Sequence, residues 1–249
     1  MARQARQKSK SDIYHIILKG INEQVIFEDK EDNVKFIETL IKYKEISGYK
    51  IFAFCLMGNH LHLLLKTDKD GLDVIIKRIA GSYVYWYNWK YNRSGHLFQD
   101  RYKSEVVEND SYLLTVLRYI HLNPVKAGLC KKPEIYEYCS YNDYIKGKSE
   151  LVDILFIQSI INENDFIVFH KNNDDQHVMD DKNTKTRLND SEATAIIIEI
   201  AECKHSSEVQ TYEIERRNKI IKILNKQGLS IRQLSRLTGI SKGIIERNL

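Results

Sequence analysis

Residues 54–65 contain the feature that most restricts the fold, an apolar stretch that carries two histidines two positions apart. Bulky aliphatic residues in such a run are typical of a buried strand. Side chains alternate along a strand, so His60 and His62 lie on one face and Leu61 on the other. Two neutral imidazoles on a rigid strand form half of a metal site. The alternative is that they are satisfied core or edge residues, the usual role of a lone histidine.

Gly58 and Asn59 precede the histidines and are typical of a turn, which predicts a hairpin of two strands. Alternation and helical spacing elsewhere predict further strands and three helices, the last of them ended by Pro124. The order strand, helix, strand, strand, helix, strand, helix favours an α+β sandwich, an antiparallel sheet with helices on one face. The predicted strands are 12–19, 50–57, 60–67 and 97–107, and the predicted helices are 29–47, 70–91 and 111–123, the last with Asn109 or Asp110 as its N-cap.

The third predicted helix contains Tyr119 and Asn123. At about 100° per residue these two side chains differ by about 40° and lie one turn apart, whereas His121 points away from both. A phenol and an amide therefore share one helix face. The alternative is a packing tyrosine beside a C-capping asparagine, because the chain has fifteen tyrosines.

Composition predicts a soluble globular protein. The 249 residues carry a net charge of +4, and no eighteen apolar residues run together, which predicts no membrane partner. Four cysteines without a Cys-x-x-Cys pair predict a reducing, cytoplasmic location. Residues 1–11 are polar and basic, and we interpret them either as an arm that lies on phosphates or as a solvated tail.

Several basic residues are candidates for DNA binding. Arg101 and Lys103 share a face of the predicted strand 97–107, and Arg93 lies in a turn before it. The helix 70–91 before this turn is rich in tyrosine and tryptophan. Its rings form either core and interface or a stacking surface for unpaired bases.

The last third of the chain predicts a separate helical module. Residues 171–190 are polar and read as a linker, and 191–203 and 209–227 are predicted helices. Ser230 and Gln233 form a capping-box pattern before a short helix, and Ser241 precedes the final one. This layout is typical of a helix-turn-helix, with Lys242 and Arg247 facing duplex DNA. The alternative is a small helical packing or oligomerisation module.

Four segments, 13–20, 54–65, 94–104 and 118–128, together resemble the REP-associated tyrosine transposases, a family of single-tyrosine HUH (His-hydrophobic-His) transposases. The resemblance covers roughly residues 12–145, and Gly58 stands where a proline is common in the family. It implies a ferredoxin-like fold, a divalent cation (Mg²⁺ or Mn²⁺) and single-stranded, hairpin-containing DNA as substrate. By position, His60 and His62 are the metal pair, Asn123 is the third ligand and Tyr119 is the nucleophile. The C-terminal helices resemble the DNA-binding end of bacterial replication initiators.

These patterns predict a transposase that cleaves and rejoins single-stranded DNA through a 5′-phosphotyrosine. The alternatives are a DNA-binding regulator without catalysis and a metal-dependent hydrolase that uses water. A monomer and a homodimer both stay open. The predicted divisions are a basic arm (1–11), a catalytic domain (12–148), a helical extension (149–170), a linker (171–190) and a helical module (191–249).

Overall fold

A computed structural model describes residues 7–171, 178–179, 188 and 190–249. Four strands form one antiparallel sheet in the order β2-β3-β1-β4. Two long helices separate the strands in the chain, in the order β1-α1-β2-β3-α2-β4, as in a ferredoxin-like sandwich. The bounds are β1 Ile13–Lys19, α1 Lys30–Ser47, β2 Lys50–Met57, β3 His60–Lys66, α2 Leu72–Lys90 and β4 Lys103–Val106.

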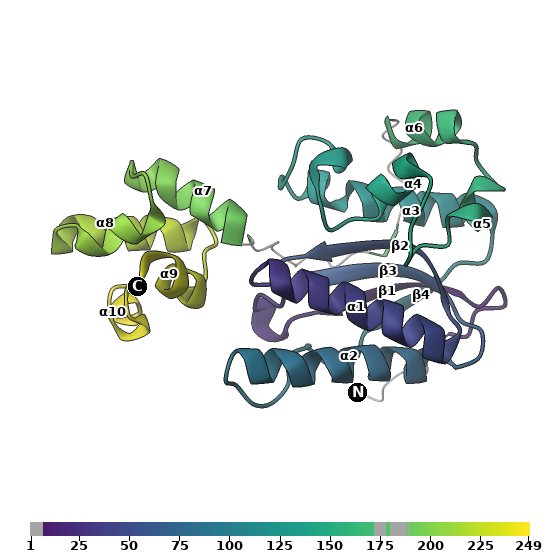
Figure 1. Ribbon diagram of the computed structural model, residues 1–249, viewed down its shortest axis with the longest axis horizontal. Coiled ribbons are helices and arrows are strands. Elements are labelled where there is room, and N and C mark those ends of the chain that lie inside the picture. Colours follow the sequence, from purple (N-terminus) through teal and green to yellow (C-terminus); the bar gives the residue numbers. More distant parts are fainter. Residues whose placement is uncertain (1–6, 172–177, 180–187, 189) are drawn as a thin grey trace.

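The helices form a layer on each face of this sheet (Figure 1). The helices α1 and α2 cover one face, as predicted. The following helices, α3 (Asp110–Lys126), α4 (Tyr141–Lys146), α5 (Ile154–Gln158) and α6 (Glu163–Lys171), lie on the other side. The α+β class and the antiparallel sheet are confirmed, and α3 adds a layer over the second face.

Local sequence signals set the first layer. Asp29 and Asp32 form a reciprocal capping box at the start of α1. Gly48 ends that helix in the left-handed conformation, at φ 73°. The turn of Gly58 and Asn59 joins β2 to β3, so the predicted hairpin is confirmed.

Some predicted elements differ from the structure in their extent. The strand of 97–107 is shorter, because β4 starts at Lys103, and Arg101 lies in the bend before it rather than on a shared strand face. The helix predicted to stop before Pro124 continues to Lys126. Pro124 lacks the N–H that would bond to the Ile120 carbonyl, but helical bonding resumes after it, since the Ala127 N–H donates to the Asn123 carbonyl at 2.9 Å. The predicted helical extension of 149–170 is divided into α5 and α6.

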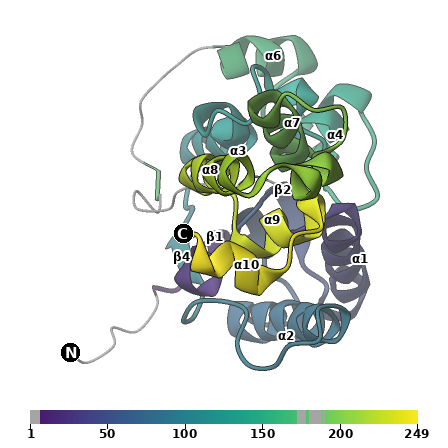
Figure 2. The same cartoon turned by 90° about the vertical axis from the view of Figure 1, so that its left-hand side faces the viewer.

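The C-terminal helices have a hydrophobic core of their own. They are α7 (Asp190–Ala201), α8 (Ile214–Lys226), α9 (Ile231–Thr238) and α10 (Lys242–Arg247), and they pack around one buried cluster (Figure 2). The capping box of Ser230 and Gln233 is present at the start of α9. Gly239 ends α9 at φ 77°, and Ser241 precedes α10. The predicted helix 209–227 begins later, at Ile214, after a short 3-10 segment.

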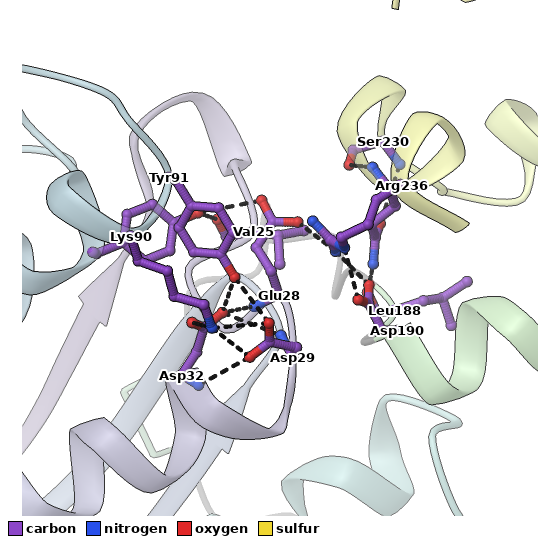
Figure 3. A network of polar contacts seen from close by, with 12 residues as sticks. Val25, Glu28, Asp29, Asp32, Lys90, Tyr91, Leu188, Asp190, Ser230 and Arg236 are labelled. Atoms are coloured by element: carbon purple, nitrogen blue, oxygen red, sulfur yellow. Dashed lines mark hydrogen bonds and ion pairs between the residues drawn. The ribbon is translucent and has the colours of Figure 1, made fainter. Parts of the chain in front are cut away.

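An ion pair joins this module to the sheet domain (Figure 3). Arg236 of α9 donates to the buried carboxylate of Glu28, with 2.9 Å between Nη2 and Oε2. The same guanidinium binds Asp190 through Nε, at 2.9 Å. Glu28 lies beside the N-terminus of α1, where Lys90 of α2 contacts Asp29 at 2.7 Å. The last turn of α2 and the first turn of α1 thus form a charged cluster next to the contact with α9.

Parts of the predicted arm and linker lie outside the described residues, namely 1–6, 172–177, 180–187 and 189. The backbone N–H of Lys10 donates to Glu108 at 3.0 Å, so the described end of the arm runs beside the segment that follows β4. Among the helices that the structure describes, none is long and apolar enough to cross a membrane.

Candidate active site

The two histidines of β3 lie side by side on the sheet face that α3 covers. His60 and His62 are both buried, and their ring centroids are 5.2 Å apart. The rings share a face because the strand alternates, and Leu61 between them is buried in the core.

The helix α3 brings a phenol and an amide to the same place. The Asn123 side-chain amide lies 3.1 Å from His62 Nε2. The Tyr119 ring meets the His62 ring edge to face, with 5.6 Å between centroids. His121 points the other way, to His170 and Ser140, at 3.0 and 2.8 Å. The helical spacing therefore separates the groups as expected, and Pro124 does not disturb the turn between Tyr119 and Asn123.

A third imidazole belongs to this cluster, and sequence reasoning did not include it. His15 of β1 is fully buried, and its Nε2 lies 3.0 Å from His62 Nδ1. Its ring also meets Tyr119 edge to face, at 5.9 Å. The register explains the contact: His15 pairs with Leu64, so His62 is its diagonal neighbour on the adjacent strand. The register between distant strands is not visible in the sequence.

A carboxylate lies beside His15 on the neighbouring strand β4. Glu105 of β4 stands directly opposite His15 in the register, and its Oε2 is 3.7 Å from His15 Nδ1. Burial alone would raise the pKa of Glu105, but the nearby His15 and Tyr112 side chains and the hydrogen bond from the Met179 backbone outweigh it, and the pKa is lowered. Glu105 is therefore an anion at neutral pH.

The donors at this site fit a divalent cation. His60 Nδ1 is 2.9 Å from Asn59 Oδ1, and His62 Nδ1 contacts His15, so a neighbour occupies the Nδ1 of each ring. This leaves the Nε2 atoms as metal donors, the usual arrangement of ligating histidines. Burial lowers the pKa of His62 well below its ordinary value, as do the nearby His60 and His15, so the ring is neutral as a ligand must be.

The Asn123 amide is the candidate third ligand. Within the described part of the chain, no three His, Cys, Asp or Glu side chains are grouped so that they could hold a metal ion. Asn123 supplies the missing oxygen if its amide is turned so that Oδ1 faces His62, an orientation that the positions of the heavy atoms do not decide. A site of two imidazoles and one amide oxygen suits Mn²⁺ better than Mg²⁺, because Mg²⁺ prefers oxygen ligands.

Lys126 is a second residue that the sequence patterns did not indicate. It lies two turns after Tyr119 on α3, and its Nζ is 5.2 Å from the centre of the Tyr119 ring. Lys126 also lines a pocket of about 420 Å³ together with three more lysines, Lys131, Lys132 and Lys171. A cationic pocket thus begins beside the phenol.

The other candidate DNA-binding residues lie at separate places. Lys103 pairs with Ile17, which pairs with His62, so Lys103 faces the same layer about 10 Å away across two strands. Arg93 is held in the turn after α2, where it donates to the His96 carbonyl at 2.9 Å. Arg101 is exposed before β4, and Lys242 and Arg247 are exposed on α10.

The aromatic run of α2 is divided between core and surface. Tyr83 and Tyr87 are fully buried, whereas Tyr85 and Trp89 are 80% and 76% exposed on the outer face. Lys90, near the end of this run, is bound to Asp29 and Asp32. Most of the run is therefore core, and the stacking alternative applies only to Tyr85 and Trp89.

Comparison with known proteins agrees with this geometry. Residues 8–123 match the family described as "Transposase IS200 like", a range that includes both histidines, Tyr119 and Asn123. No curated protein matches the chain. A REP-associated tyrosine transposase bound to a REP hairpin has a similar structure, with a TM-score of 0.52, 17% identity, and coverage of 62% of this chain and 90% of that one.

A candidate transposase from Deinococcus radiodurans is also similar, with a TM-score of 0.35, 18% identity, and coverage of 48% of this chain and 95% of that one. The first of the two structures establishes a shared fold. Through residues 8–123, this chain is similar to the IS200-like transposase family.

Proposed function

We propose that this protein is a transposase that cleaves and rejoins single-stranded DNA through a covalent 5′-phosphotyrosine formed on Tyr119. The observation that carries the proposal is the convergence of four groups on one sheet face: Tyr119 and Asn123 from α3 against His60 and His62 from β3. Similarity to a transposase family supports DNA as the substrate. The arrangement is that of a nucleophile beside a site for a cation.

The reaction needs a nucleophile and a means to reduce the negative charge of the phosphodiester. A divalent cation held by His60, His62 and Asn123 would polarise the non-bridging oxygens and orient the scissile phosphate. The Tyr119 oxygen attacks the phosphorus, a tyrosine–phosphate bond forms, and the bond to the 3′-oxygen breaks. The phenolic proton passes to solvent, and the leaving 3′-oxygen takes up a proton.

This intermediate keeps the energy of the phosphodiester, because one phosphate ester replaces another. A free 3′-hydroxyl of a second strand reverses the step: it attacks the phosphotyrosine, and the phenol leaves. Strand transfer then needs no nucleotide cofactor. Lys126 beside the Tyr119 ring favours the approach of the anionic backbone.

We propose a hairpin-containing single strand as the substrate and duplex DNA as a second partner. The structurally similar REP-associated transposase is bound to a REP hairpin, which supports the first part. The second part rests on α9 and α10, two short helices joined through Gly239 in the manner of a helix-turn-helix. Lys242 and Arg247 are exposed on α10 and would contact the duplex, and Arg93, Arg101 and Lys103 would contact the single strand.

The test uses end-labelled DNA hairpins with single-stranded flanks, incubated with the full chain and Mn²⁺ and separated on a denaturing gel. The proposal predicts a labelled band at the mass of protein plus DNA. Tyr119→Phe and EDTA should each abolish it. Tyr85→Phe is the matched control, because Tyr85 is exposed on the outer face of α2, and it should leave the band unchanged.

The other outcomes identify the alternatives. Cleavage without a covalent band, unchanged in Tyr119→Phe, would point to a hydrolase that uses water. Binding of the hairpin without cleavage, with Mn²⁺ present, would point to a regulator.

A further inference from the structure

Three polar side chains on neighbouring strands lie in a row behind the candidate metal site: His15 and His62 are buried, and Glu105 is 29% exposed. Glu105 of β4 faces His15 of β1, with 3.7 Å between Oε2 and Nδ1. His15 in turn faces His62 of β3, with 3.0 Å between Nε2 and Nδ1. His62 Nε2 lies 3.1 Å from the Asn123 amide at the other end. The sheet register aligns all of these groups on one face.

The protons of this row of side chains can be assigned from its geometry. Glu105 is an anion, so the nitrogen of His15 that faces it, Nδ1, carries a proton rather than a lone pair. In a neutral imidazole the other nitrogen, Nε2, is then an acceptor. The contact at 3.0 Å requires one donor, which must be the Nδ1–H of His62. His62 therefore has its lone pair on Nε2, directed at Asn123.

We propose that His15 and Glu105 are positioning residues that fix the Nδ1–H tautomer of His62 and hold its Nε2 lone pair toward the cation. The inference rests on the proposed function for the presence of a cation, and it concerns only how this chain prepares one ligand. Carboxylate–histidine pairs behind a ligating histidine are a general means of orienting the ring and raising its basicity. Here the pair acts on the ligand through a second imidazole.

Further contacts hold Glu105 in place. The backbone N–H of Met179 donates to Glu105 Oε2 at 3.2 Å, and Tyr112 of α3 lies near enough to help lower the pKa of the carboxyl group. These contacts orient the carboxylate toward the sheet. The chain of groups is therefore supported from β4, from α3 and from the segment that contains Met179.

Two alternative roles of His15 predict different experimental results. If His15 only fills space, a phenylalanine of similar volume would preserve the site. If His15 is doubly protonated beside Glu105, its Nε2–H would donate to His62 Nδ1, and His62 would carry its proton on Nε2. The tautomer of His62 in the cation-free protein distinguishes the second case from the proposal without changing His15 or Glu105.

The experiment records the ¹⁵N and ¹H correlations of the imidazole nitrogens in the full chain, with EDTA and without DNA. The signals of His62 are assigned by their loss in His62→Gln. We expect a protonated Nδ1 and an unprotonated Nε2 for His62. An unprotonated Nδ1 with a protonated Nε2 would overturn the proposal, whatever the variants do.

The second measurement is the affinity for Mn²⁺ alone, from the electron paramagnetic resonance signal of the free ion. His15→Phe removes the acceptor, and we expect a 10- to 100-fold weaker affinity, the range seen when outer-shell partners of ligating histidines are removed. His15→Gln keeps an amide oxygen as acceptor and should recover part of the loss. His96→Phe, a change at an exposed histidine, is the control.

An unchanged Mn²⁺ affinity in His15→Phe, with thermal unfolding like that of wild type, would refute the positioning role. If His15→Phe does not fold, Glu105→Ala tests the same row of side chains and should also weaken the affinity. Glu105→Gln should weaken it less, because the amide oxygen still accepts from His15. Neither measurement uses DNA. If the gel assay showed no covalent protein–DNA band, the tautomer and the Mn²⁺ affinity would still test the role of His15 and Glu105.

Discussion

Arg236 and Glu28 form an ion pair of 2.9 Å across 208 positions of the sequence. Glu28 is 2% exposed and also accepts a hydrogen bond from the Tyr87 hydroxyl at 3.2 Å. Burial raises the pKa of Glu28, while Arg236 acts against this rise. A buried carboxylate of this kind is costly unless a cation stays beside it, so the pair holds α9 against the sheet domain.

Arg236→Ala should therefore destabilise the chain by about 2 to 4 kcal/mol, because it leaves the Glu28 charge buried without its cation. Urea unfolding of the full chain measures the loss. In the Glu28→Gln background the same substitution should cost less than about half as much, since no charge is left behind. Equal losses in both backgrounds would contradict the account. Arg247→Ala, which removes an exposed side chain of α10, is the control.

The pair of His121 and His170 predicts a loss of stability in acid. Burial lowers the pKa of His170 to about 4 and that of His121 well below its ordinary value. The unfolded chain binds these protons near pH 6.5, so it holds more protons than the folded chain between about pH 6.5 and 4. Stability must then decrease as the pH falls through this window, by at most about 2 kcal/mol between pH 7 and 5 for His170.

Urea unfolding at pH 7 and pH 5, in EDTA to exclude metal release, measures this change. His170→Gln should lose less stability on acidification than the wild type. His96→Gln, at an exposed position, should behave as the wild type. A His170→Gln protein with an undiminished pH effect would show that other groups cause it.

Substitution of Lys126 should change the salt dependence of hairpin binding. It lies beside Tyr119 and lines the cationic pocket, so we expect it to contact a backbone phosphate of the single strand. Lys126→Gln should weaken hairpin binding several-fold and reduce the slope of log K against log salt by about 0.7, the value for one phosphate contact on a single strand. Fluorescence anisotropy over a series of salt concentrations gives both quantities.

Lys77→Gln provides the control for this prediction. Lys77 is exposed on α2, which covers the opposite face of the sheet. Its slope and affinity should equal those of the wild type. The phosphate contact would be wrong if the two variants behaved alike.

The substitution Asn123→Ala should weaken cation binding and leave the stability of the protein close to that of the wild type. The change removes the amide beside His62 Nε2 and keeps both imidazoles. The affinity for Mn²⁺ should fall about 10-fold or more, because a ligand is lost. Asn123→Asp, which keeps an oxygen at this position, should retain most of the affinity. Equal affinities of wild type and Asn123→Ala would exclude Asn123 as a ligand.

Local patterns predicted much of the sheet domain. The hairpin could be predicted from two local signals, the turn at Gly58 and Asn59 and the alternation around His60 and His62. Both signals lie within a few residues of each other. The four-residue spacing of Tyr119 and Asn123 was enough to predict that both side chains lie on one face of the helix. Pro124 was misleading, because α3 continues past it to Lys126.

The parts that could not be predicted depend on contacts between distant segments. His15 and Glu105 join the site only through the register of β1 with β3 and β4. The helix α3 covers the second sheet face, which the order of elements alone did not indicate. Arg236 meets Glu28 through packing of the module on the domain, and no short-range pattern contains both residues.

The most direct test of the covalent mechanism is mass spectrometry of the trapped protein–DNA adduct after digestion with trypsin. Cleavage after Arg118 and Lys126 releases residues 119–126 as one peptide, with Tyr119 as its only tyrosine. The account predicts that this peptide carries the 5′-phosphate of the cleaved DNA and that the released strand has a free 3′-hydroxyl. DNA attached to any other peptide, or through its 3′-phosphate, would contradict it.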